Sequence, residues 1–95
     1  MNFLEQMANI GSEVERALSW RAKNNGAYSH SAAERALELM DLTLDSVKTL
    51  PRLKEVARTR EVLVDYFFGA NEYGSTEAAL KNYFSAFTYA ARRHL

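Results

Sequence analysis

Apolar residues recur every three or four positions along most of the chain, and this spacing predicts amphipathic helices. The repeats cover roughly residues 2–25, 31–48, 51–68 and 76–93. The first stripe consists of Phe3, Met7, Ile10, Val14, Ala17 and Leu18. Gly11 lies inside this helix, where a glycine can mark a close approach of another helix. Short connections favour sequential packing, so residues 1–95 are expected to form one domain, an all-α antiparallel four-helix bundle.

Capping residues separate the predicted helices. Gly26 is expected to end the first helix. Ser31 and Glu34 form a capping-box pattern, in which each side chain accepts from the other residue's backbone amide, at the expected start of the second helix. Ser75 or Thr76 is expected to cap the fourth helix, because serine and threonine side chains accept from the amides of the first turn.

Composition limits the cellular location and the class of partner expected for this bundle. The 95 residues include no cysteine, which excludes disulfides and favours a reducing, cytoplasmic location. The N-terminus lacks the basic and apolar regions of a signal peptide, and no apolar run approaches the roughly 20 residues that span a membrane. Twelve basic residues balance twelve acidic ones, so charge does not indicate a nucleic-acid partner.

Two arginines interrupt apolar stripes. Arg21 falls in line with Ile10 and Val14, and Arg60 falls in line with Val56. An unpaired guanidinium is costly to bury, so each must pair with a carboxylate, reach solvent, or contact a ligand or partner. An internal ion pair is the simpler interpretation. Arg60 is the stronger ligand candidate because it lies in the middle of its helix.

A row of carboxylates follows one ridge of the second predicted helix, formed by Glu34, Glu38, Asp41 and Asp45. Such a row can hold Mg²⁺ together with substrate phosphates. The segment from Glu38 to Asp41 is similar to the ExxD element of small helical nucleotide pyrophosphohydrolases, but their preceding EExxE element is missing here. The other interpretation is a solvated face that pairs with basic residues of the next helix. No other metal ligand set and no other cofactor is expected.

Several large apolar residues point away from the predicted core stripes. They are Trp20, Leu39, Leu42, Tyr66 and Tyr89. Monomeric proteins rarely expose large apolar patches, and aromatic residues are enriched at interfaces. We therefore expect some of these residues to contact another chain, in a homo-oligomer or with a partner protein.

The segment GAYSHSAAERALEL, from Gly26 to Leu39, resembles the second-helix region of HEPN-like domains. These small four-helix bundles occur in prokaryotic toxin–antitoxin pairs and beside minimal nucleotidyltransferases. Ribonucleases of that family carry an arginine followed a few residues later by a histidine. Here His30 follows Arg21 by nine positions, and His94 directly follows Arg93. The resemblance therefore implies a catalytically silent member that dimerises or pairs with a partner.

The sequence leaves three functions open. The first is a non-catalytic helical interaction module that self-associates or docks on a partner protein, as an accessory to a nucleotidyltransferase or a toxin–antitoxin system. The second is a Mg²⁺-dependent nucleotide or RNA hydrolase that uses Arg60 and the acidic row. The third is a regulator that binds RNA or nucleotide through Arg92 and Arg93 without turnover. The absence of P-loop, zinc-protease and serine-hydrolase motifs favours the first.

Overall fold

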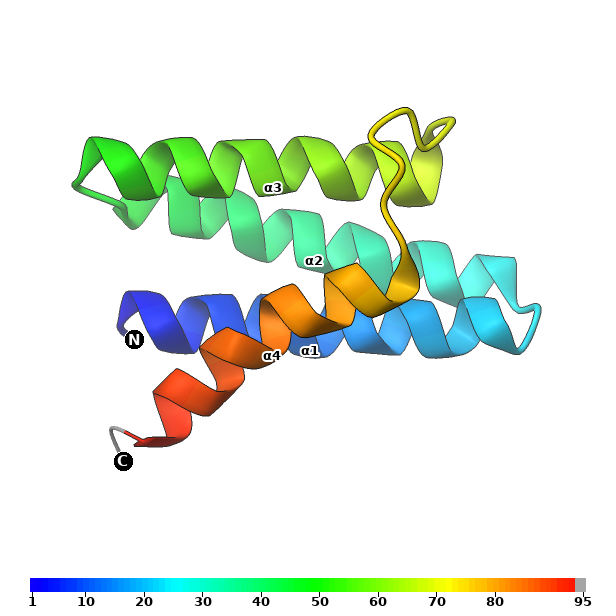
Figure 1. Ribbon diagram of the computed structural model, residues 1–95, viewed down its shortest axis with the longest axis horizontal. Coiled ribbons are helices and arrows are strands. Elements are labelled where there is room, and N and C mark those ends of the chain that lie inside the picture. The colour runs from blue at the N-terminus through cyan, green and yellow to red at the C-terminus, as the bar shows by residue number, and fades with distance from the viewer. Residues whose placement is uncertain (94–95) are drawn as a thin grey trace.

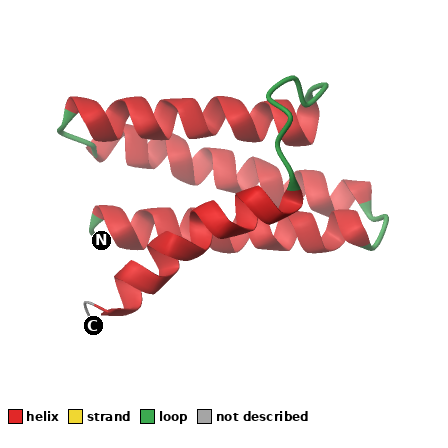
Figure 2. Ribbon diagram, viewed as in Figure 1, coloured by secondary structure: helices red, strands yellow, loops and turns green. Residues whose placement is uncertain are grey.

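Four helices account for most of the chain in the computed structural model, which describes residues 1–93 (Figures 1 and 2). They are α1 (Phe3–Ala22), α2 (Gly26–Ser46), α3 (Leu50–Phe68) and α4 (Glu77–Arg93). The first three alternate in direction, and α4 returns obliquely across α1 (Figure 1). The predicted all-α four-helix bundle is confirmed. His94, singled out above, lies outside the described residues.

The start of α2 differs from the prediction. The helix begins at Gly26, because the Asn25 side chain accepts a hydrogen bond from the Tyr28 amide at 3.0 Å and caps it there. Asn24 adopts a left-handed backbone, with φ at 61°, that turns the chain out of α1. Gly26 therefore opens α2 instead of ending α1. The expected cap at Ser31 is wrong, since Ser31 lies inside the helix.

A network of side-chain hydrogen bonds holds the loop between α3 and α4. The Asp65 carboxylate accepts from the backbone amides of Glu72 at 2.8 Å and Tyr73 at 3.1 Å. The loop ends at Thr76, whose hydroxyl accepts from the Ala79 amide at 3.1 Å and caps α4. Of the two caps that the sequence suggested for α4, the structure uses Thr76. The path of the loop is therefore fixed from both ends.

The core lies around α1, which packs against both α2 and α4. The largest fully buried side chains of the core include Phe84, Met7, Ile10, Leu18, Met40 and Leu63. Gly11 faces Phe84 of α4 so closely that an added Cβ would lie 2.8 Å from the Phe84 Cβ. The close helix approach expected at Gly11 is therefore present, and it sets where α4 crosses α1.

The side of the bundle between α3 and α4 is open. Among the described residues, no α-carbon of α3 lies within 8 Å of an α-carbon of α4. A side-chain hydrogen bond crosses the gap, donated by the Thr59 hydroxyl to the Tyr83 phenol oxygen at 3.1 Å. No helix within residues 1–93 combines the length and hydrophobicity needed to cross a membrane.

Candidate functional site

Arg60 pairs with Asp41 across the interface between α3 and α2. Its Nε donates to Asp41 Oδ1 at 2.8 Å and its Nη2 donates to Asp41 Oδ2 at 3.4 Å, so the contact is a two-bond fork. The Arg60 side chain keeps 37% of its surface exposed and that of Asp41 57%. An exposed pair of this kind typically stabilises a fold by about 0.2–1 kcal/mol. The geometry thus gives Arg60 a structural partner within the chain.

The acidic row of α2 follows a solvent-exposed face of the helix. Within residues 1–93, no group of three or more histidine, aspartate and glutamate side chains is placed to hold a metal ion. Glu38 and Asp45 are exposed, and Asp41 is occupied by Arg60. The row therefore has the character of a solvated helix face with one ion pair to the neighbouring helix.

Arg21, near the end of α1, contacts the C-terminal part of α3 through Tyr66. Its guanidinium lies over the Tyr66 ring, 4.5 Å from the ring centroid, and its Nη1 donates to the Tyr66 carbonyl oxygen at 3.3 Å. Tyr66 itself is half-buried against Phe67, with ring centroids 5.1 Å apart. Within the described part of the chain, no carboxylate pairs with Arg21. Stacking and one hydrogen bond therefore fix this cation in place.

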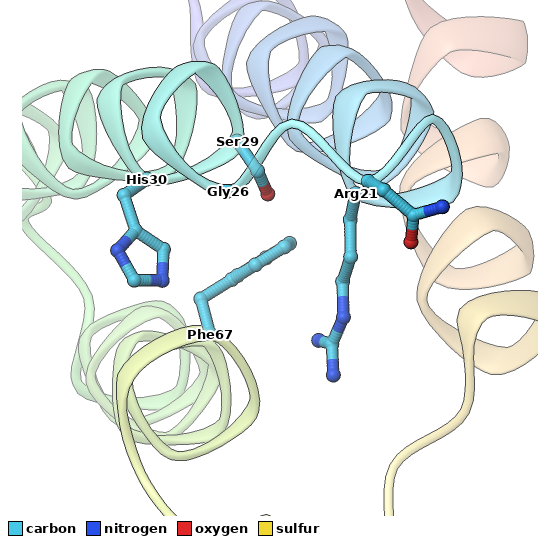
Figure 3. A pocket seen from close by; sticks show the side chains of 6 residues that line it. Arg21, Gly26, Ser29, His30 and Phe67 are labelled. Atoms are coloured by element: carbon cyan, nitrogen blue, oxygen red, sulfur yellow. The ribbon is translucent and has the colours of Figure 1, made fainter.

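A cavity of about 330 Å³ opens beside Arg21 at the α1–α2 turn, and we call it the turn pocket. It is lined by Arg21, Asn24, Gly26, Ser29, His30 and Phe67. Figure 3 shows the Phe67 ring between Arg21 and His30, so helices α1, α2 and α3 each contribute a side chain. His30 is exposed and its ring lies 4.7 Å from the Phe68 ring, centroid to centroid.

Sequence reasoning singled out Arg21 as a residue that must find a partner or ligand, but gave His30 no part in a site. The two residues share one pocket because α2 begins at Gly26 and His30 already lies on its first turns. The buried Ser29 hydroxyl is not free to act there, since it donates to the Ala17 carbonyl oxygen at 2.8 Å. The signal that could have revealed the pocket is the Asn24-Asn25-Gly26 turn.

The residues predicted to form an interface fall into two groups. Leu42 and Tyr89 are strongly exposed, at 64% and 65%. Leu39 and Tyr66 are half-buried against the core, and Trp20 packs edge-on against Tyr28 with ring centroids 4.9 Å apart. Among the described residues, α2 and α4 have no α-carbons within 8 Å of each other. Leu42 and Tyr89 therefore lie on helices that do not pack against each other.

A groove of about 240 Å³ follows the open side of the bundle, and we call it the α3–α4 groove. Its lining consists of Arg58, Thr59, Val62, Ser75, Ala79, Leu80 and Tyr83. Val62 and Tyr83 are half-buried on its two walls. Burial raises the pKa of Tyr83 to about 12, so the phenol stays neutral in the groove.

The chain exposes more surface than a compact monomer of its mass. Its accessible surface is 6141 Å² for 10.8 kDa. Folded monomers of that mass expose about 5500 Å². The excess agrees with a bundle that is open along one side.

No protein-family model, curated protein or solved structure matches this chain. The chain is a small all-helical domain of four helices, and no family is identified.

Proposed function

We propose that this chain is a non-catalytic helical interaction module whose α3–α4 groove receives a helix of a second copy. The observation that supports this most directly is the separation of α3 from α4, which leaves an apolar-lined groove at the surface. Amphipathic helices bind such grooves through apolar side chains that recur every three or four residues. Val62, Leu80 and Tyr83 offer the complementary apolar wall.

The amount of uncovered surface suits such an interface. The 6141 Å² that the chain exposes exceeds the value for a compact monomer by about 600 Å². A standard protein–protein interface covers about 800 Å² on each partner.

A second copy is the occupant that we infer, for two reasons. Most soluble oligomers are two-fold symmetric homodimers, in which the same surface serves on both partners. The chain also carries no formal net charge, so two copies approach without overall repulsion. In such a dimer the groove of each copy receives a helix of the other copy.

The test is sedimentation velocity across the micromolar range on the wild type and two matched variants. Val62→Lys places a charge on the groove wall, whereas Leu42→Lys places it at an exposed apolar position on α2. We expect dimers for the wild type and Leu42→Lys, and a monomer of unchanged helix content for Val62→Lys. A wild type that stays monomeric would refute self-association, and dissociation by Leu42→Lys alone would move the interface to α2.

The resemblance to HEPN-like domains supports the same proposal. It implies a domain that dimerises or pairs with a partner, in a prokaryotic setting, as an accessory to a nucleotidyltransferase or a toxin–antitoxin system. The lack of cysteine separately favours a cytoplasmic location. The hydrolase alternative gains no support from the geometry, because Arg60 and Asp41 occupy each other.

A further inference from the structure

The turn pocket holds a cation whose hydrogen-bonding capacity is mostly unused. A guanidinium has five N–H donors, and the contact that Arg21 makes with the Tyr66 carbonyl uses one of them. The guanidinium also lies over the Tyr66 ring, 4.5 Å from the ring centroid, so two contacts restrain its orientation. An arginine fixed in this way loses little side-chain freedom when it binds a ligand, which favours binding.

The electrostatic character of the pocket is positive. Its lining residues include an arginine and a histidine but no aspartate or glutamate. The first turn of α2, which borders the pocket at Gly26, also contains no acidic residue. The partial positive charge of that helix end is therefore not offset by an acidic side chain of its own first turn. These features together favour an anionic ligand over a neutral or cationic one.

We infer that the turn pocket binds a small phosphorylated molecule, with its phosphate on the free edge of Arg21. The guanidinium fork matches phosphate oxygens in two-bond geometry. The volume of about 330 Å³ is far larger than one phosphate requires and lies at the lower end of ligand pockets. The remainder of the ligand then lies along Phe67 towards His30, whose imidazole is placed to hydrogen-bond it (Figure 3).

A free small molecule fits the pocket better than a nucleic-acid chain. Nucleic-acid affinity depends on several basic residues that contact successive phosphates. The pocket supplies one arginine, and the chain as a whole has no formal net charge. Recognition is therefore confined to one phosphate and the group that it carries.

The test is isothermal titration with AMP, adenosine, glucose 6-phosphate and inorganic phosphate on the wild type and three variants. Arg21→Gln removes the proposed anchor, and His30→Gln removes the imidazole. Lys23→Gln is the matched control, because Lys23 is a nearby cation that lies outside the pocket lining. Circular dichroism checks that each variant keeps its helices.

We expect at least one of the two phosphorylated molecules to bind the wild type and Lys23→Gln equally. Arg21→Gln should weaken that binding by at least about tenfold, the scale of one lost charge-assisted hydrogen bond. His30→Gln should weaken it less, and inorganic phosphate should compete. Three results would overturn the inference: adenosine binding as tightly as AMP, unchanged binding by Arg21→Gln, or no binding of any phosphate compound at millimolar concentration.

Discussion

The environment of Tyr83 in the α3–α4 groove changes the pKa of its phenol. Its phenol lies half-buried on the wall of the α3–α4 groove and accepts a hydrogen bond from Thr59 of α3 at 3.1 Å. Burial disfavours the charged phenolate and raises the pKa to about 12, from an ordinary value of 10.0. The fold therefore accepts Tyr83 only in its neutral form.

This raised pKa predicts a loss of stability at alkaline pH. In the unfolded chain Tyr83 ionises near pH 10, whereas the folded chain holds the proton up to about pH 12. The folded state thus binds more protons between these values, so the free energy of unfolding falls as the pH rises through them. The stabilising contribution is complete below pH 10 and lost above pH 12. Urea unfolding at a series of pH values measures this fall.

Tyr83→Phe is the comparison that assigns the effect. The other tyrosines titrate in both proteins, so their contribution cancels between the two curves. The variant should lose stability more gently between pH 10 and pH 12 than the wild type. Parallel curves would mean that another group causes the alkaline fall.

The two arginines show what periodicity predicts for single residues and where it stops. Helical spacing placed Arg21 and Arg60 on inward faces and required a partner for each. It could not identify the partners, because Asp41 and Tyr66 lie on other helices and meet these arginines only after tertiary packing. Arg60 pairs with a carboxylate of α2, whereas Arg21 lies over an aromatic ring of α3.

At the scale of the elements, the decisive feature is the early start of α2. The capping-box pattern of the sequence placed the start of the helix at Ser31, whereas the structure starts it after Asn25. Asn25 acts as the cap because Asn24 turns the chain there. The turn pocket depends on this choice, since a helix beginning at Ser31 would leave His30 in a loop. The sequence therefore predicted the helix but not the pocket at its end.

Substitution of Asn25 and of Ser31 should show which of the two residues caps α2. Asn25→Ala removes the side chain that accepts from the Tyr28 amide and should lower the free energy of unfolding by about 0.5–2 kcal/mol. Ser31→Ala should change it by no more than about 0.5 kcal/mol, because Ser31 is an exposed position inside the helix. Urea unfolding followed by circular dichroism measures both. The reverse order would place the functional cap at Ser31.

At the scale of the whole molecule, the sequence predicted four helices and the packing of α1 on α2 and of α2 on α3, but α4 packs on α1 and leaves the side facing α3 open. Apolar stripes show which face of each helix is buried. They do not fix the direction in which two helices cross, which depends on how closely their backbones approach. Here the Gly11 backbone admits Phe84, and α4 settles obliquely on α1, away from α3.

An open groove that is filled by a second copy predicts a stability that depends on concentration. Association stabilises the folded state by mass action, so the melting temperature should rise with protein concentration. Val62→Lys, which places a charge in the groove, should abolish this dependence while leaving the curve cooperative. Differential scanning fluorimetry over a hundredfold concentration range provides the measurement. A melting temperature independent of concentration in the wild type would argue against the dimer.

The attachment of α4 also has a consequence for the order in which the chain assembles. Among the described residues, α4 has no α-carbon within 8 Å of α2 or α3, so its place depends on α1. Helices α1 and α2 are neighbours in sequence and meet at a small cost in chain entropy, whereas Phe84 must return to Gly11 across most of the chain. We therefore expect assembly to begin with the α1–α2 hairpin and to close with α4. Until that last step, the apolar surface around Gly11 that Phe84 covers stays exposed. We expect the chain to be most prone to aggregation during this interval.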